Sequence, residues 1–220
     1  MSDLVIAGLA AAAAAAVVSE PGQRVVRSAT SGVREAVAPT RLPLPAGLEP
    51  FRTALIAAAR ANGIKPSLLA ALSLQENRRS DPTITLNNKP ESWIVGNKYF
   101  DPARRRGWTD VELARVYGLT QIKGATAITV GYTGLPAGLL NPRTNLELGA
   151  RYLAKQIRAE KSVRMGLVRY NGGNVAVSAV KRGEDHFSAR YADMVLARQK
   201  LLEARRLSEA LTNDPRRYLV

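Results

Sequence analysis

Apolar residues recur mostly at intervals of three and four between residues 50 and 210, which is the period of helices that bury one face. Prolines and Asn-Gly or Gly-Gly pairs interrupt this pattern where helices would start or stop. Signals for strands are sparse, and residues 92–95 (Ser-Trp-Ile-Val) are the best candidate for one. The chain is therefore expected to be all-α or nearly so.

Capping and breaking residues predict where individual helices begin and end. A first helix is expected over residues 50–61, where Asn-Gly follows, and Pro66 suits the first turn of a second helix. Asn141-Pro142 predicts the cap and first turn of a long helix. A shorter helix is expected to end at residues 170–173, and a last long helix to start near Ser188.

Composition divides the chain into three parts. Residues 1–48 are expected to hold an Ala-rich helix, an amphipathic helix over residues 25–37 and a Pro-rich linker. The main domain is expected over residues 49–197, and a helix extension with a tail over residues 198–220. The apolar run at residues 4–18 is short for a membrane span, so a packed or interfacial helix is expected, with a signal peptide or membrane anchor as the alternative.

The net charge and the counts of cysteine and histidine limit the partners and the kinds of active site that the chain can have. Lys and Arg number 32 against 18 Asp and Glu, a net charge of +14, which favours polyanionic partners without choosing among nucleic acid, anionic lipid and wall polymers. The chain has no cysteine and a single histidine, which argues against disulfides, thiolate or His-rich metal centres and a Ser-His triad. We therefore expect no metal and no cofactor. His186 is expected to be solvated or locally bonded, with no ligand role. The run Arg104-Arg105-Arg106 beside Trp108 is expected to be a solvated charge run.

Glu76 stands where an apolar residue would be expected. It follows Leu68 and Leu72 at intervals of four, so it shares their face of the second helix. Burial disfavours the charged form of a carboxyl, and the negative end of the helix dipole acts in the same direction. A glutamate that stays protonated near neutral pH is a general acid. From spacing alone, the alternative is a surface glutamate paired with Arg78 or Arg79.

Short motifs along the chain resemble those of the lytic transglycosylase family, whose soluble members have a goose-type lysozyme-like domain. In order, they are Ala70–Glu76, Tyr117–Ile122, Asn141–Leu153, Tyr170–Gly173 and Tyr191 with Val195. The resemblance covers roughly residues 50–197. This chain departs from the family in having Asn77 after the glutamate, Thr120 in place of a common Met, and a longer stretch between Glu76 and Gly118.

The resemblance implies a peptidoglycan lytic transglycosylase that cleaves the β-1,4 bond between N-acetylmuramic acid (MurNAc) and N-acetylglucosamine (GlcNAc). It implies that Glu76 protonates the leaving sugar and then acts as base on the 6-hydroxyl of MurNAc. That hydroxyl closes a 1,6-anhydro ring without water or a second carboxylate. The other carboxylates between residues 81 and 112 are expected to be solvated.

The resemblance also implies substrate contacts for four further residues, and each has an ordinary structural alternative. Gln121 would otherwise bond neighbouring backbone, and Tyr170 would be a core tyrosine. Asn171 would otherwise terminate a helix, and Tyr191 would pack in the core.

The expected partner is the peptidoglycan glycan strand. The expected setting is a phage virion protein that opens the host wall during genome entry, because the N-terminus lacks a convincing export signal; a bacterial periplasmic or envelope enzyme is the alternative. Terminal helices are expected to contact other virion or envelope proteins, and the basic surface an anionic membrane or DNA. A structural virion or secretion-apparatus protein with an inactive lysozyme-like domain and a hydrolytic lysozyme remain alternative functions.

Overall fold

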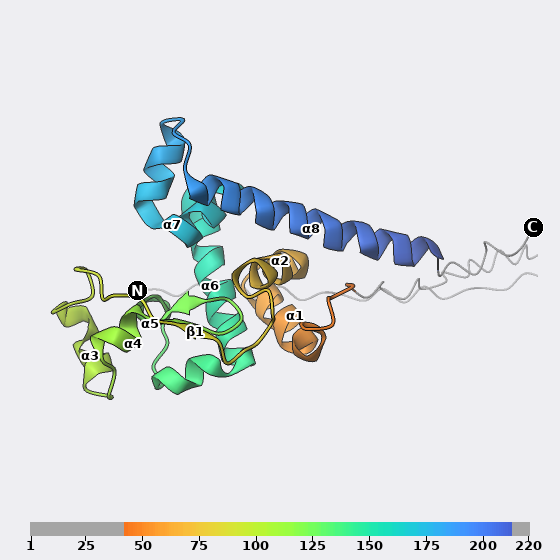
Figure 1. Cartoon of the computed structure of the whole chain (residues 1–220). Helices are drawn as coiled ribbons and strands as arrows, with labels where there is room; N and C mark the ends of the chain where they lie inside the picture. The colour runs from red at the N-terminus through yellow and green to blue at the C-terminus, as the bar shows by residue number, and fades with distance from the viewer. Residues whose placement is uncertain (1–41, 213–220) are drawn as a thin grey trace, which may run out of the picture. The chain divides into compact units, whose positions relative to one another are not determined.

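The computed structural model describes residues 42–212, with side chains described as far as residue 205, and this part of the chain is predominantly helical (Figure 1). The helices expected over residues 4–18 and 25–37 lie outside the described residues. The α-helices are α1 (Arg52–Ala61), α2 (Pro66–Glu76), α3 (Asp101–Arg104), α4 (Asp110–Ala114), α5 (Gly124–Thr129), α6 (Pro142–Glu160), α7 (Val163–Lys181) and α8 (Phe187–Thr212). Short 3-10 helices are η1 (Glu49–Phe51), η2 (Lys98–Phe100) and η3 (Pro136–Leu140). The expectation of a nearly all-α fold is confirmed.

Local signals set the helix ends as expected. Pro66 is the first residue of α2, and Gly63, with φ of 67°, follows the end of α1. The side-chain oxygen of Asn141 accepts a hydrogen bond from the backbone N–H of Thr144 at 3.2 Å, which caps α6. These caps satisfy backbone groups that a helix terminus otherwise leaves unpaired.

A small antiparallel sheet interrupts the helices. Its strands β1 (Thr85–Leu86), β2 (Val116–Tyr117) and β3 (Ile122–Lys123) lie in that order, with β2 paired to both neighbours. The prediction of a strand at residues 92–95 is wrong, because these residues form turns in which only Ile94 is fully buried. Two-residue strands are too short to show the alternation that identifies a strand in a sequence.

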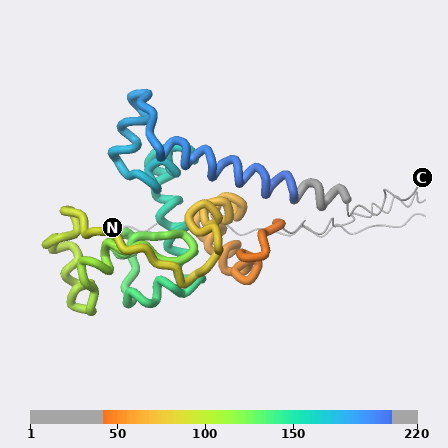
Figure 2. The backbone as a smooth tube through the Cα atoms, in the orientation of Figure 1, coloured from red at the N-terminus to blue at the C-terminus, as the bar shows by residue number. Residues whose placement is uncertain are grey.

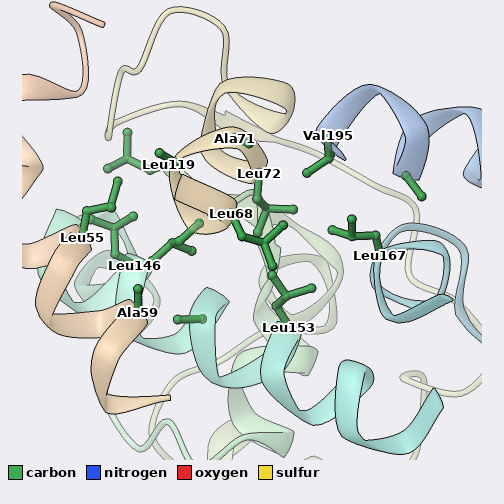
Figure 3. Close-up of a cluster of buried hydrophobic side chains, with 14 of the residues drawn as sticks. Leu55, Ala59, Leu68, Ala71, Leu72, Leu119, Leu146, Leu153, Leu167 and Val195 are labelled. Carbon is green, nitrogen blue, oxygen red and sulfur yellow. The ribbon is translucent and has the colours of Figure 1, made fainter. Parts of the chain in front are cut away.

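Two apolar clusters hold the described part together. The first joins α1, α2, α6, α7 and α8, and Figure 3 shows its leucines meeting between these helices. The second gathers the segment between α2 and α6 around Trp108 and Tyr117. Helix α6 supplies both, with Leu146 in the first cluster and Leu148 in the second. In Figure 2 the yellow-to-green chain between α2 and α6 lies to one side of α1 and α2.

The helix expected to end at residues 170–173 does end there, because Gly173 has non-helical angles, with φ of 65° and ψ of −158°. A second helical segment, which the sequence did not predict, follows directly and completes α7 as far as Lys181. Glycine tolerates this left-handed geometry, so the break is local. The helix resumes because Ala176, Val177 and Ala179 bury one face of its second half. No helix within residues 42–212 is long and apolar enough to cross a membrane.

Candidate active site

A cleft of about 770 Å³ lies where α2, the sheet, α6 and the bend of α7 meet. Four of the five predicted site residues line it: Glu76, Gln121, Tyr170 and Asn171. The fifth, Tyr191, contacts the carboxyl group of Glu76 from α8. The structure thus brings together residues separated by more than a hundred positions in the sequence.

Glu76 is the last residue of α2 and is partly buried in the cleft wall. Burial raises the pKa of its carboxyl from 4.5 to about 7, and a hydrogen bond from the Tyr191 hydroxyl to Oε1 offsets part of this rise. Among the ion pairs of residues 42–205, none joins Glu76 to Arg78 or Arg79, both of which are exposed. The carboxyl therefore exchanges its proton near neutral pH, as a general acid requires.

Tyr191 combines a packing role with a polar one. It is buried with Val195 on the face of α8 that meets the first apolar cluster. Burial and the nearby Glu76 carboxylate both raise the pKa of its phenol, so the hydroxyl keeps its proton. It can therefore donate to Glu76 whether that group is charged or neutral.

Tyr170 stands at the bend of α7. Its hydroxyl donates to the carbonyl oxygen of Thr120 at 2.8 Å, and its ring packs against that of Tyr152 with centroids 5.1 Å apart. Burial raises the pKa of the Tyr170 phenol well above its ordinary value. Because its proton is committed to Thr120, the hydroxyl can offer a ligand only its oxygen lone pairs.

Gln121 occupies the turn between β2 and β3 with φ of 44°. Its amide Nε2 donates to the carbonyl oxygen of Gly118 at 2.7 Å, which is the backbone-bonding role that the sequence left open. Its Oε1 is buried and has no hydrogen-bond partner among the residues that the structure describes. A ligand hydroxyl or amide would satisfy this acceptor.

Asn145 builds the turn that presents Gln121 and was not singled out from the sequence, although it lies within a family motif. It is fully buried in α6, where its Oδ1 accepts from the backbone N–H of Thr120 at 2.8 Å and its Nδ2 donates to Tyr117 at 2.8 Å. A Cβ atom at Gly118 would lie 2.7 Å from Asn145 Nδ2, so this position requires glycine. Buried amides are rare enough that an asparagine on an apolar helix face is the signal for such a role.

Asn171 is exposed in the cleft, and α8 orients its amide. The hydroxyl of buried Ser188 donates to Asn171 Oδ1 at 2.8 Å, which leaves the Nδ2 donor for a ligand. A Cβ atom at Gly172 would lie 2.3 Å from the Ser188 hydroxyl oxygen, so glycine permits the approach of the two helices. Ser188 was predicted only as a helix start, because nothing local in the sequence links it to Asn171.

Glu91 also lies in the cleft wall, where sequence reasoning expected a solvated carboxylate. It forms an ion pair with Lys123 of β3 and accepts a hydrogen bond from the indole Nε1 of Trp93. Burial would raise the pKa of Glu91, but the hydrogen bonds from Lys123 and Trp93 outweigh it and lower the pKa overall. The cleft therefore contains one carboxyl poised to hold a proton and a second held charged.

Two other surface predictions have mixed outcomes. Arg104 is not simply solvated, since it forms ion pairs with Asp101 at 2.9 Å and Asp110 at 2.7 Å, and Trp108 is buried. His186 lies near the N-terminus of α8, and its Nδ1 accepts from the backbone N–H of Ser188. Within the described part of the chain, no group of three or more His, Cys, Asp or Glu residues could hold a metal ion.

The family model described as the transglycosylase SLT domain matches residues 53–192. This range begins in α1 and ends just beyond Tyr191, so it includes each of the predicted site residues. No curated protein and no solved structure gives a significant match.

Proposed function

The chain belongs to the transglycosylase SLT domain family, and on this premise we propose that it is a peptidoglycan lytic transglycosylase. It cleaves the β-1,4 bond between MurNAc and GlcNAc and leaves 1,6-anhydro-MurNAc ends. The observation that carries the proposal is the Glu76 carboxyl, which stands in the cleft with a pKa of about 7.

Glu76 performs both proton transfers in this mechanism. Its protonated carboxyl gives a proton to the glycosidic oxygen as the bond from MurNAc C1 to that oxygen breaks, through an oxocarbenium-like transition state. The carboxylate then removes the proton of the MurNAc 6-hydroxyl, whose oxygen bonds to C1 and closes the anhydro ring. Glu76 ends protonated, so one side chain completes the cycle. The Tyr191 hydroxyl stabilises the intervening carboxylate by its hydrogen bond to Oε1.

A hydrolytic lysozyme is the second candidate, because Glu91 provides another carboxylate in the cleft. In hydrolysis a second carboxylate acts as nucleophile or activates a water molecule. Glu91 is unsuited to either role while Lys123 and Trp93 occupy its oxygens. The ion pair therefore favours the route in which Glu76 acts alone.

Clearing of purified peptidoglycan by the wild type, Glu76→Gln and Glu91→Gln tests these assignments. We expect Glu76→Gln to lose at least about 100-fold in rate, since it removes the carboxyl that supplies the proton in this mechanism. Glu91→Gln keeps an acceptor for Trp93 and should stay within about tenfold of the wild type. Mass spectrometry of the products should show anhydro ends, which lack one water relative to hydrolysed ends.

Three outcomes would change the assignment. Equal clearing by Glu76→Gln and the wild type would remove Glu76 from the mechanism. Hydrolysed ends together with loss of activity in Glu91→Gln would establish the lysozyme. No clearing by any of the folded proteins would favour the structural protein with an inactive domain.

We extend the proposal to the setting, which is a phage virion that opens the host wall during genome entry. The basic charge supports it, since it suits contact with anionic envelope polymers or packaged DNA. Proteomics of purified virions tests this extension. Recovery of the protein from a bacterial envelope fraction in cells without phage would replace the virion by the bacterial setting.

A further inference from the structure

Trp93 is a large apolar side chain left open to the cleft. It belongs to the segment between β1 and β2, lines the cleft wall and keeps 43% of its surface exposed. The other tryptophan of the chain, Trp108, is 2% exposed in the second apolar cluster. An exposed indole in a concave site is a common feature of ligand recognition, because burying it on binding is strongly favourable.

Neighbouring side chains hold the Trp93 ring in place before any ligand arrives. Its Nε1 donates to Glu91, the Lys123 ammonium lies 5.8 Å from its ring centroid, and the Phe100 ring packs at 5.7 Å. Lys123 is itself paired with Glu91, so the indole of Trp93, the carboxylate of Glu91 and the ammonium of Lys123 each interact with the other two. A ring fixed in this way loses little conformational freedom when a ligand covers it.

These contacts determine what kind of ligand the ring can accept. The indole N–H is already used by Glu91, so Trp93 offers an apolar surface and no hydrogen-bond donor. The charges of Glu91 and Lys123 compensate each other, so this wall presents no net charge to an acidic or basic peptide. A pyranose ring matches this arrangement, because its C–H groups pack on an aromatic ring while its hydroxyls meet the polar rim.

We propose that Trp93, supported by Glu91 and Lys123, forms a sugar-binding subsite for an N-acetylhexosamine ring of the glycan strand. The inference rests on the proposed function, since it assigns a binding role within the same cleft. It assigns recognition at this wall to the carbohydrate and not to the stem peptide. Glu91 and Lys123 act here as positioning residues for the ring.

Binding of chitotetraose, a β-1,4 GlcNAc tetramer without peptide, to full-length Glu76→Gln protein tests the proposal. This background prevents cleavage, and the two tryptophans serve as reporters. We expect a saturable change in tryptophan fluorescence that disappears in Trp93→Phe, where only buried Trp108 remains. Calorimetry should show that Trp93→Ala weakens binding about tenfold, while Trp93→Phe retains most of the affinity.

Leu135→Ala is the control, since Leu135 is also a large apolar side chain with 58% of its surface exposed and does not line the cleft. It should bind chitotetraose as well as the parent. Equal affinity of the Trp93→Ala and parent proteins, with unchanged circular dichroism, would overturn the subsite. So would binding of peptide-bearing strands without binding of chitotetraose.

The two proposals fail separately. If the wild type but not Glu76→Gln clears walls, and chitotetraose binding does not depend on Trp93, the proposed enzyme stands and the proposed subsite does not. Chitotetraose binding that depends on Trp93, without wall clearing by the wild type, would sustain the subsite in a non-catalytic glycan-binding domain.

Discussion

At the scale of single residues, the proposed mechanism makes activity depend on the proton of Glu76. Its pKa of about 7 means that the acid form predominates below neutral pH and is lost above it. Free enzyme must carry this proton to begin a cycle, so kcat/KM on peptidoglycan should fall as pH rises through about 7, by about tenfold for each further unit. A pH profile of initial clearing rates measures this, and a profile flat from pH 5 to 9 would contradict it.

Tyr191→Phe changes this profile in a predictable direction. The hydroxyl of Tyr191 favours the charged form of Glu76, so its removal raises the pKa of Glu76 further. We expect the fall in kcat/KM to move to higher pH by about one pH unit, since a hydrogen bond to a charged group is worth about 1.5 kcal/mol or more. Tyr99→Phe, which alters an exposed phenol outside the cleft, should leave the profile unchanged. A move to lower pH would show that Tyr191 acts on Glu76 in the opposite sense.

The sequence predicted some of these residues for a physical reason and missed others for one. Glu76 could be predicted because Leu68 and Leu72, which precede it on the same face of the helix, already define a buried face. Glu91 and Lys123 are 32 positions apart, and the Asn171–Ser188 hydrogen bond joins different helices. Such interactions between distant residues depend on how helices and strands pack against each other. The sequence around a single charged or polar residue does not indicate which residue it will contact.

At the scale of elements, the bend of α7 places the tyrosine–asparagine motif and the following turn along one side of the cleft. Gly173 makes the bend with φ of 65°, and a Cβ atom there would meet no other group within 4 Å. A substitution at this position is therefore unfavourable through backbone geometry alone. The sequence correctly predicted that a helix ends here, but a glycine pair does not reveal that a second helical segment follows directly and reaches Lys181.

Gly173→Ala should lower both stability and activity. Positive φ combined with an extended ψ is a conformation that glycine adopts almost alone, so forcing alanine into it costs about 1–3 kcal/mol. Relaxation of the bend would displace Asn171 and Tyr170 from the cleft. Gly183→Ala is the matched control, because Gly183 also has positive φ (80°) with open space around it and does not line the cleft. Denaturant unfolding should show that both variants lose similar amounts of unfolding free energy. Clearing assays should show a loss of activity in Gly173→Ala alone. Equal activity of the two folded variants would separate the bend from catalysis.

At the scale of the whole molecule, the proposed function assigns the net charge of +14 and the neutral wall of the cleft to different parts of the same substrate. Long-range attraction would concentrate the protein on an anionic wall, and such attraction weakens as salt shortens the Debye length from about 10 Å at 0.1 M to about 3 Å at 1 M. Recognition of a sugar ring by Trp93 and its compensated ion pair involves no net charge on either side. The two contributions should therefore separate in their response to salt.

Sedimentation of Glu76→Gln protein with intact cell walls, between 50 mM and 500 mM NaCl, measures the first contribution without cleavage. We expect wall affinity to fall at least about tenfold over this range, because screened charges no longer hold the protein at the surface. The affinity for chitotetraose should stay within about twofold over the same range, since that ligand is uncharged. Wall affinity that does not change with salt concentration would mean that the basic charge binds a partner other than the wall. A salt-sensitive affinity for chitotetraose would mean that unpaired charges, and not the indole, recognise the sugar.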